Sequence, residues 1–218
     1  MPVAPFDRSF FERTHMPLRN TFKTIAIMVA LIFWTNFAWA KNQNLTPGQT
    51  VKELMGSIQH IKKSDGLTPQ QIETNQVSSQ KALALMDLEK VSQKTLGKYW
   101  KKRTLEEQKS FISLLSEIFV NIAFPSSAQF FANLKIKFLD SEIEENKASV
   151  PISVTSPDDG EVDIDFTLQA NKGVWQITDV ILDGVSMRNN LRSQFRKVIK
   201  SKGYLELVKR MKKKVGEG

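Results

Sequence analysis

The fold of this chain is decided by residues 162–195, VDIDFTLQANKGVWQITDVILDGVSMRNNLRSQF. Apolar and polar residues alternate from Val162 to Leu168, and this period of two indicates a strand with one buried face. The sequence NKG at 171–173 predicts a hairpin turn, after which a second strand carries the chain back. Asp183-Gly184 ends that strand. Ser186 can then cap a helix, because its hydroxyl can accept an orphan backbone N–H.

Two further strands are expected before this stretch, because apolar residues recur at every second position there. They alternate with lysines around 135–137 and with small or polar residues around 150–154. The four antiparallel strands are expected at about 133–140, 142–154, 161–170 and 173–182. With helices before and after them, the expected class is α+β, with a curved four-stranded antiparallel sheet covered by a helical subdomain.

Three helix starts share one sequence pattern. Thr46, Thr68 and Thr104 are each followed three residues later by Gln or Glu, which predicts three capping boxes. The helical region after the second start is expected to break near Val77 to Ser79, and the helix after the third to end at Pro125. Two more helices are expected at about 186–201 and 203–214, divided at Gly203. On the last of these, Leu205, Val208 and Met211 are expected to form the apolar side.

The first 40 residues have the pattern of a secretory signal peptide. Basic Arg19 and Lys23 precede the apolar run Ile25–Trp34, and Ala38-Trp39-Ala40 is a cleavage site of the small-x-small type. A membrane anchor is the alternative, but this run is about half of the roughly 20 residues that a spanning helix needs. Translation from Met16 would leave a complete signal peptide, so the start stays open. Residues 41–218 are expected to be one domain, with a helical part at about 46–132, a sheet at about 133–183 and C-terminal helices at about 186–214.

Composition narrows the function. The chain has no cysteine, which excludes thiolate catalysis and cysteine-ligated metal centres. Residues 1–40 hold four of the 31 basic and two of the 23 acidic residues, so the remainder keeps 27 and 21, a net charge of +6. This charge favours acidic partners or anionic headgroups, and nucleic acid is not expected outside the cytoplasm. The basic residues cluster near the C-terminus at Lys209, Arg210, Lys212, Lys213 and Lys214.

Residues for catalysis are few. His60 is the only histidine after residue 40, and a surface position on an amphipathic helix is its simplest interpretation. Asp163 and Asp165 fall on the same, outward side of a strand. No metal-ligand spacing, phosphate loop or dinucleotide motif is present in the sequence. We therefore expect no enzyme activity, no cofactor and no metal.

The same C-terminal stretch, with an upstream run, resembles a known family. The residues that carry the resemblance are Trp175, Asp179-Val180, Gly184-Val185-Ser186, Arg192 and Gln194-Phe195, together with Leu96-Gly97-Lys98-Tyr99-Trp100 and 104–111. They resemble the signature of the MlaC-type periplasmic phospholipid-binding proteins, the auxiliary components of the Mla ("toluene tolerance") ABC transport system. The similarity covers roughly 51–214. Met86-Asp87-Leu88 departs from the aromatic-Asp-aromatic triplet that the family usually has at this place.

The resemblance implies a sheet of the nuclear-transport-factor-2-like (cystatin-like) kind and a cavity for acyl chains, with the headgroup near its mouth. It implies a monomeric carrier in the Gram-negative periplasm that supports outer-membrane lipid asymmetry. Its partners would be an outer-membrane lipoprotein complex and an inner-membrane ABC transporter with an MCE-domain protein. Two alternatives stay open: a carrier of another lipid such as a hopanoid, and a small periplasmic hydrolase or isomerase on the same fold.

The candidate site residues come from one helical stripe and from the inward side of the strands. The stripe supplies Phe111, Leu115, Ile118, Phe119 and Ile122, and the strands supply Ile136, Phe138, Val150, Ile152, Ile164 and Phe166. The residues with an expected structural role are Trp175, Asp179, Gly184, Ser186, Arg192 and Phe195. For any single phenylalanine, ordinary core packing is the simpler interpretation.

Overall fold

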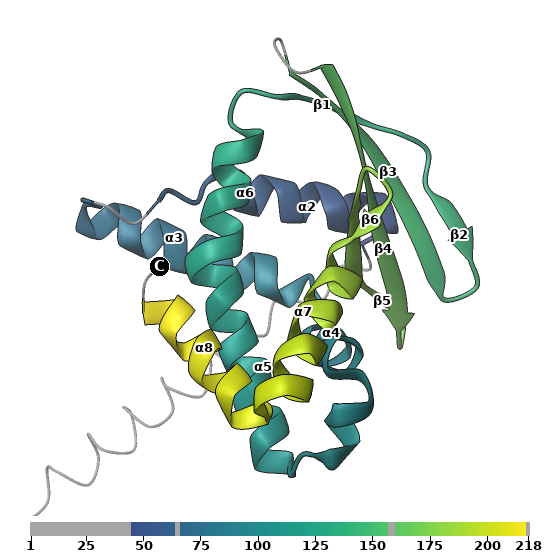
Figure 1. Ribbon diagram of the computed structural model, residues 1–218. Helices are drawn as coiled ribbons and strands as arrows, with labels where there is room; N and C mark the ends of the chain where they lie inside the picture. Colours follow the sequence, from purple (N-terminus) through teal and green to yellow (C-terminus); the bar gives the residue numbers. More distant parts are fainter. Residues whose placement is uncertain (1–44, 64–65, 157–159, 217–218) are drawn as a thin grey trace, which may run out of the picture. The chain divides into compact units, whose positions relative to one another are not determined.

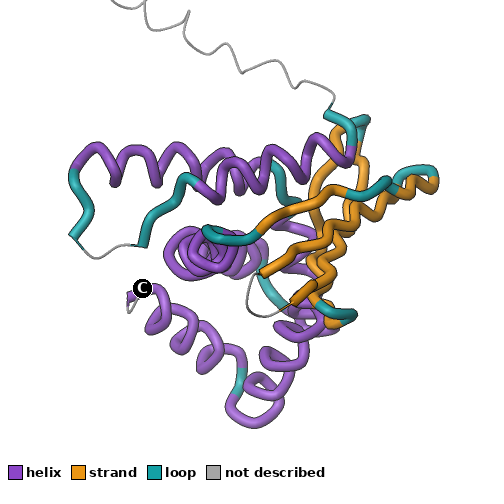
Figure 2. Tube along the Cα trace, turned by 90° about the horizontal axis from the view of Figure 1, so that it is seen from above, coloured by secondary structure: helices purple, strands orange, loops and turns teal. Residues whose placement is uncertain are grey.

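The computed structural model describes residues 45–63, 66–156 and 160–216. The predicted signal peptide lies outside the described residues. Within them, helices lie along one side of an antiparallel sheet (Figures 1 and 2). The α+β class is confirmed.

The first helices begin where the capping boxes predict. α2 (Pro47–Gln59), α3 (Pro69–Ala84) and α5 (Leu105–Ile118) have Thr46, Thr68 and Thr104 as their N-caps, and all three reciprocal boxes are present. Each box satisfies two backbone N–H groups that the helix itself cannot. The three predicted helix starts are therefore confirmed.

The predicted break near Val77 to Ser79 is wrong, because α3 continues to Ala84. The chain leaves the helix at Leu85 instead, where Met86 forms a parallel bridge with Ile177 of the sheet. The Ile177 N–H donates to the Leu85 carbonyl at 2.9 Å, and the Asp87 N–H donates to the Ile177 carbonyl at 3.0 Å. This pairing between distant parts of the sequence ends the helix. α4 (Leu88–Leu96) and a 3-10 turn, η1 (Gly97–Lys102), follow.

Pro125 does not end the next helix, which is the second correction. α5 passes into a π-helical turn, η2 (Phe119–Ala123), and then into α6 (Phe124–Phe131), with Pro125 in the first turn of α6. A proline inside a regular α-helix would clash with the carbonyl four residues before it. The wider π turn, in which the Phe124 N–H bonds to the Phe119 carbonyl, accommodates the ring.

The continuous helix Leu105–Phe131 is long and apolar enough, by length and composition, to cross a membrane. Core helices of water-soluble domains pass the same test. Only 28% of the most apolar 18-residue stretch of this helix is buried, however. The other side chains in that part of the helix are partly buried or exposed.

The sheet has six strands where four were expected. They are β1 (Lys135–Phe138), β2 (Glu142–Glu144), β3 (Lys147–Ser156), β4 (Gly160–Asn171), β5 (Val174–Leu182) and β6 (Val185–Ser186). Their order is β1-β3-β4-β5-β6, and β2 pairs with β3. The predicted strand 142–154 is divided by a turn in which Glu145 has φ +50°. A register shift between Thr167 and Leu168 marks an irregularity of the kind that bends a sheet.

The register of β3 and β4 gives the sheet an apolar and a polar face. Val150 lies opposite Phe166 and Ile152 opposite Ile164, and all four are buried. Asp163 is exposed on the other face, as the alternation predicts. The apolar face packs on α2 and α6 to form the first core.

A sharp corner connects the sheet to the C-terminal helices. Asp183 and Gly184 both have positive φ, +46° and +74°, between β5 and β6. The Ser186 hydroxyl then accepts the Asn189 N–H at 3.0 Å and caps α7 (Met187–Lys202). The end of the strand at Asp183-Gly184 and the cap at Ser186 agree with the prediction. α8 (Tyr204–Gly216) follows Gly203.

Gly184→Val should lower the melting temperature. No atom lies within 4 Å of a Cβ placed on Gly184, so the cost comes from the positive φ alone. Strain of this kind costs about 1–3 kcal/mol, which is a shift of roughly 2–12 °C for a domain of this size. Gly56→Val is the matched control, because its Cβ also meets open space but Gly56 lies inside α2. A thermal melt in which both variants match wild type would remove the role of the backbone conformation.

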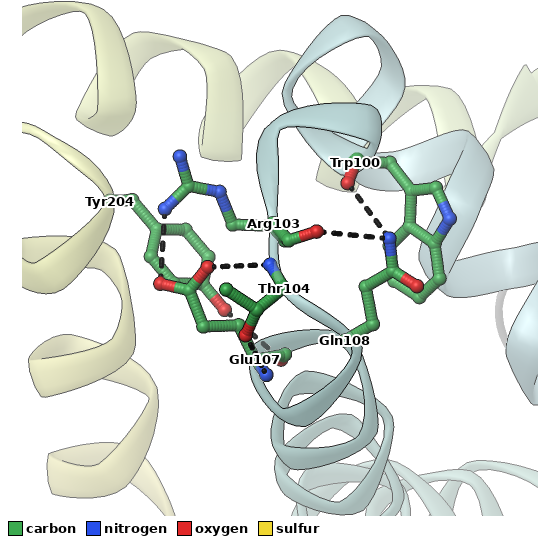
Figure 3. Close-up of polar contacts among 6 residues, drawn as sticks. All are labelled: Trp100, Arg103, Thr104, Glu107, Gln108 and Tyr204. Atoms are coloured by element: carbon green, nitrogen blue, oxygen red, sulfur yellow. Dashed lines mark hydrogen bonds and ion pairs between the residues drawn. The ribbon is translucent and has the colours of Figure 1, made fainter.

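A second core holds α8 against α5 and α7. Leu207 and Met211 are buried there, whereas Leu205 is 79% exposed, so the predicted apolar side of α8 is wrong at that residue. At one end of this core the Arg103 guanidinium lies 4.5 Å from the centre of the Tyr204 ring and pairs with Glu107 at 3.2 Å (Figure 3). Burial, and secondarily the Glu107 carboxylate, raises the pKa of Tyr204.

Candidate ligand-binding cavity

An apolar hollow of 320 Å³ lies between α2, the η2–α6 segment and the inner face of the sheet. α2 contributes Leu54, Met55 and Ile58, and α6 contributes Phe124, Phe130 and Phe131. The sheet contributes Ile164, Phe166, Ile177, Val180 and Leu182. Three separate elements thus enclose a space in which almost every contacting side chain is apolar.

A second hollow, of 440 Å³, adjoins the first and reaches α7. The two share eight lining residues: Met86, Phe119, Ala123, Ser126, Ser127, Ile177, Val180 and Met187. We therefore describe them as two compartments of one cavity. Phe119 and Ala123 of the π turn face both compartments, so part of the apolar surface of the long helix lines the cavity. Pockets of several hundred cubic ångströms with few polar groups are typical of small-molecule sites.

The second compartment has a polar end along the first two turns of α7. Thr178, Asp179, Arg188, Asn190 and Gln194 line it there. Asp179 is 6% exposed, and its carboxylate accepts three hydrogen bonds and forms one ion pair. Oδ1 accepts the backbone N–H groups of Val180 (2.9 Å) and Arg188 (3.0 Å). Oδ2 accepts the Ser186 hydroxyl (2.6 Å) and lies 3.3 Å from Arg188 Nη2. A buried carboxylate is tolerated when it is paired and hydrogen-bonded in this way.

The predicted lining residues are divided between the cavity and the two cores, except for Ile122. Phe119, Ile164 and Phe166 line the first compartment. The remaining strand residues do not line either compartment: Val150 and Ile152 are enclosed in the first core, and Ile136 and Phe138 pack partly buried against it. Phe111, Leu115 and Ile118 belong to the second core, and Ile122 is partly exposed. Ligand contact by any of these side chains stays a prediction.

Several lining residues were absent from the sequence prediction. The prediction that the helix ends at Pro125 left out Phe130 and Phe131, although the apolar spacing continues past this proline. Met86 was not predicted to line the cavity, yet it lines both compartments. Met187 lies next to the predicted cap Ser186, where helix periodicity could have placed it. α2 residues carried a clear apolar stripe, but no local pattern showed what that stripe faces.

The residues that carry the family resemblance mainly hold α7 in place. The Phe195 ring is buried in an edge-on contact with Phe111, 5.9 Å between ring centres. The Arg192 guanidinium lies against Gly97, and a Cβ on Gly97 would come within 3.1 Å of its Nε. Trp175 packs partly buried against the first core. Asp179 is the one signature residue that both caps α7 and lines the cavity.

The described residues offer little for catalysis. They contain no group of three or more His, Asp or Glu side chains that could hold a metal ion. His60 is exposed, with Nδ1 2.6 Å from the Gly56 carbonyl oxygen. The cavity can instead enclose an apolar molecule and place a polar group of that molecule near Asp179 and Arg188. The fold and cavity are thus suited to binding an amphipathic ligand.

Residues 49–213 match the MlaC protein family, and the chain belongs to it. Among solved structures, one described as the phospholipid-binding protein from Ralstonia solanacearum in complex with a phospholipid is similar in fold. The TM-score is 0.64 at 18% sequence identity, and the match covers 79% of this chain and 98% of that one. No curated protein matches the chain.

Proposed function

We propose that this protein is a periplasmic carrier that holds the acyl chains of a phospholipid in the two-compartment cavity, with the headgroup at the polar end. The observation that carries the proposal is the cavity itself, whose two compartments are lined mainly by apolar side chains and whose charged side chains, Asp179 and Arg188, lie at the start of α7. Membership of the MlaC family and the likeness to a phospholipid-binding protein support it.

Physical chemistry explains why such a carrier is useful. Transfer of about 30 methylene groups into water costs on the order of 24 kcal/mol at about 0.8 kcal/mol each. Transfer from a bilayer to an apolar cavity costs little, because both surroundings are apolar. The carrier thus removes a solvation barrier without covalent chemistry. Release into water should be rare, so delivery should require a partner that opens the cavity.

The route and partners are part of the same proposal. Residues 1–40 act as a cleaved signal peptide, and residues 41–218 act as one monomeric domain in the periplasm. The carrier moves lipid between an outer-membrane lipoprotein complex and an inner-membrane ABC transporter with an MCE-domain protein. N-terminal sequencing of the periplasmic protein should begin at Lys41, and an intact N-terminus recovered from membranes would contradict this.

Lipid extraction and mass spectrometry of the purified protein test the function. A phospholipid at about one molecule per protein is the expected result. A hopanoid or another neutral lipid in its place would favour the alternative carrier. Protein without any lipid, but with turnover of an ester or isomerisable substrate, would favour the enzyme alternative.

The basic cluster on α8, defined as Lys209, Arg210, Lys212, Lys213 and Lys214, gives a further prediction. All five side chains are exposed, and Arg210 pairs with Glu206 at 2.9 Å. If the cluster docks an acidic surface, replacing all five with Gln should slow lipid transfer between partner-bearing membranes while lipid content stays unchanged. Added salt should do the same, because the Debye length falls from about 30 Å at 0.01 M to about 8 Å at 0.15 M.

The control for this variant carries the same change of charge elsewhere. Five exposed lysines on other elements, replaced with Gln, serve this purpose: Lys62, Lys63, Lys81, Lys135 and Lys137. If transfer is insensitive both to the α8 substitutions and to salt, the cluster only complements the end of its helix.

A further inference from the structure

We propose that Arg188 binds the phosphodiester of the ligand's headgroup and thereby selects phospholipids over neutral lipids with the same acyl chains. This inference rests on the proposed function, because it needs a lipid in the cavity. The size and apolarity of the cavity do not by themselves distinguish a phospholipid from a neutral lipid, whereas a phosphate-binding Arg188 would.

Arg188 differs in charge from the other side chains that line the cavity. Among the described residues that line the two compartments, Arg188 is the only cation and Asp179 the only anion. Arg188 lies at the polar end, where a headgroup would be if the acyl chains fill the apolar compartments. Its side chain is 23% exposed, so one part is fixed by the protein and another is open to a ligand.

The fixed part of the guanidinium is well defined. Nη1 donates to the Thr178 carbonyl at 3.1 Å, and Nη2 pairs with Asp179 Oδ2 at 3.3 Å. A guanidinium carries five N–H groups, so these two contacts leave donors in the same rigid plane for another acceptor. Such a planar set of donors matches the geometry of phosphate oxygens.

The four contacts of the Asp179 carboxylate already use both of its oxygens. Asp179 therefore leaves the remaining N–H groups of Arg188 to a ligand. Asp179 acts as a positioning residue that holds Arg188 at the polar end of the second compartment. The N-terminus of the 16-residue α7 points its positive end toward the same place. Uncharged Asn190 and Gln194 bond to each other at 2.8 Å beside it, with the Gln194 amide as donor, so the Asn190 amide N–H groups can serve a ligand.

The ion pair between Arg188 and Asp179 also predicts that the site does not distinguish headgroups by their net charge. Since Asp179 balances the charge of Arg188, the polar end of the cavity attracts a phosphodiester through oriented N–H donors rather than through net charge. Zwitterionic and anionic phospholipids should therefore load about equally well. A diacylglycerol with the same chains has no phosphate and should load less well.

Competitive loading tests the inference. Delipidated protein is incubated with vesicles that contain equal amounts of a phosphatidylethanolamine, a phosphatidylglycerol and a diacylglycerol with identical chains. Bound lipid is then counted by mass spectrometry. Wild type should favour each phospholipid over the diacylglycerol about ten- to a hundredfold, the range expected for charge-assisted hydrogen bonds. Arg188→Gln should reduce this preference to near one while total bound lipid changes little.

Two further variants keep the test decisive. Arg192→Gln is the matched control, because Arg192 lies one turn along α7 and packs on Gly97 outside the cavity lining. It should retain the wild-type preference. Asp179→Asn combined with Arg188→Gln avoids an unpaired buried carboxylate if Arg188→Gln alone folds poorly, and it should show the same loss of preference.

The outcomes separate the two proposals. Wild-type protein that loads no lipid from vesicles would contradict the proposed function itself. Wild type that loads lipid, with Arg188→Gln or the double variant keeping the full preference for phosphate, would overturn the role of Arg188. Inorganic phosphate at millimolar concentration should leave lipid loading unchanged. If inorganic phosphate instead binds to delipidated wild type and not to Arg188→Gln, Arg188 binds free phosphate rather than a headgroup.

Discussion

Ala123→Trp should remove bound lipid without lowering the melting temperature. Ala123 lies in the π turn and lines both compartments, so an indole at this position would project into the space where they join. Because the space already exists, the larger side chain should avoid most of the cost of overpacking a closed core. The purified variant should contain at least about tenfold less lipid than wild type, as measured by extraction and mass spectrometry.

Asn121→Trp is the control, since it adds the same indole two residues earlier in the same turn. Asn121 is exposed and lines neither compartment, so this variant should keep its lipid. Equal lipid content in the two variants, both folded, would mean that the acyl chains lie elsewhere. Loss of lipid from both would point to the π turn as a whole rather than to the cavity.

Phe111→Ala should strongly destabilise the protein and leave lipid content unchanged in the molecules that fold. The Phe111 ring is 1% exposed in the second core, against Phe195 and Tyr204. Removing a buried phenyl ring costs about 3–5 kcal/mol. At about 2–4 °C per kcal/mol, the melting temperature should fall by roughly 6–20 °C.

Leu105→Ala is its control on the same helix, because Leu105 is 70% exposed and its truncation should stay within about 0.5 kcal/mol. The sequence-based hypothesis that Phe111 lines the cavity predicts the opposite order of effects, with lipid lost and stability kept. A thermal melt and a lipid count on the same preparation decide between the two.

The sequence by itself determined the features that depend on near neighbours in the chain. Thr46, Thr68 and Thr104 cap helices because a capping box needs only residues three positions apart. The alternation around Ile164 identified a strand and its inward side, since side chains alternate along any strand. The end of β5 followed from Asp183-Gly184, because this dipeptide favours a turn.

The tertiary structure decided where the cavity is. Phe111 and Phe119 lie on one apolar stripe and are alike in sequence, yet one is enclosed in the second core and the other lines the cavity. The helix continues through Pro125 because a π turn relieves the clash, and α3 ends where Met86 meets Ile177. A local pattern shows that a side chain avoids water, but only packing between distant segments determines whether protein atoms fill the space beside it or leave that space open.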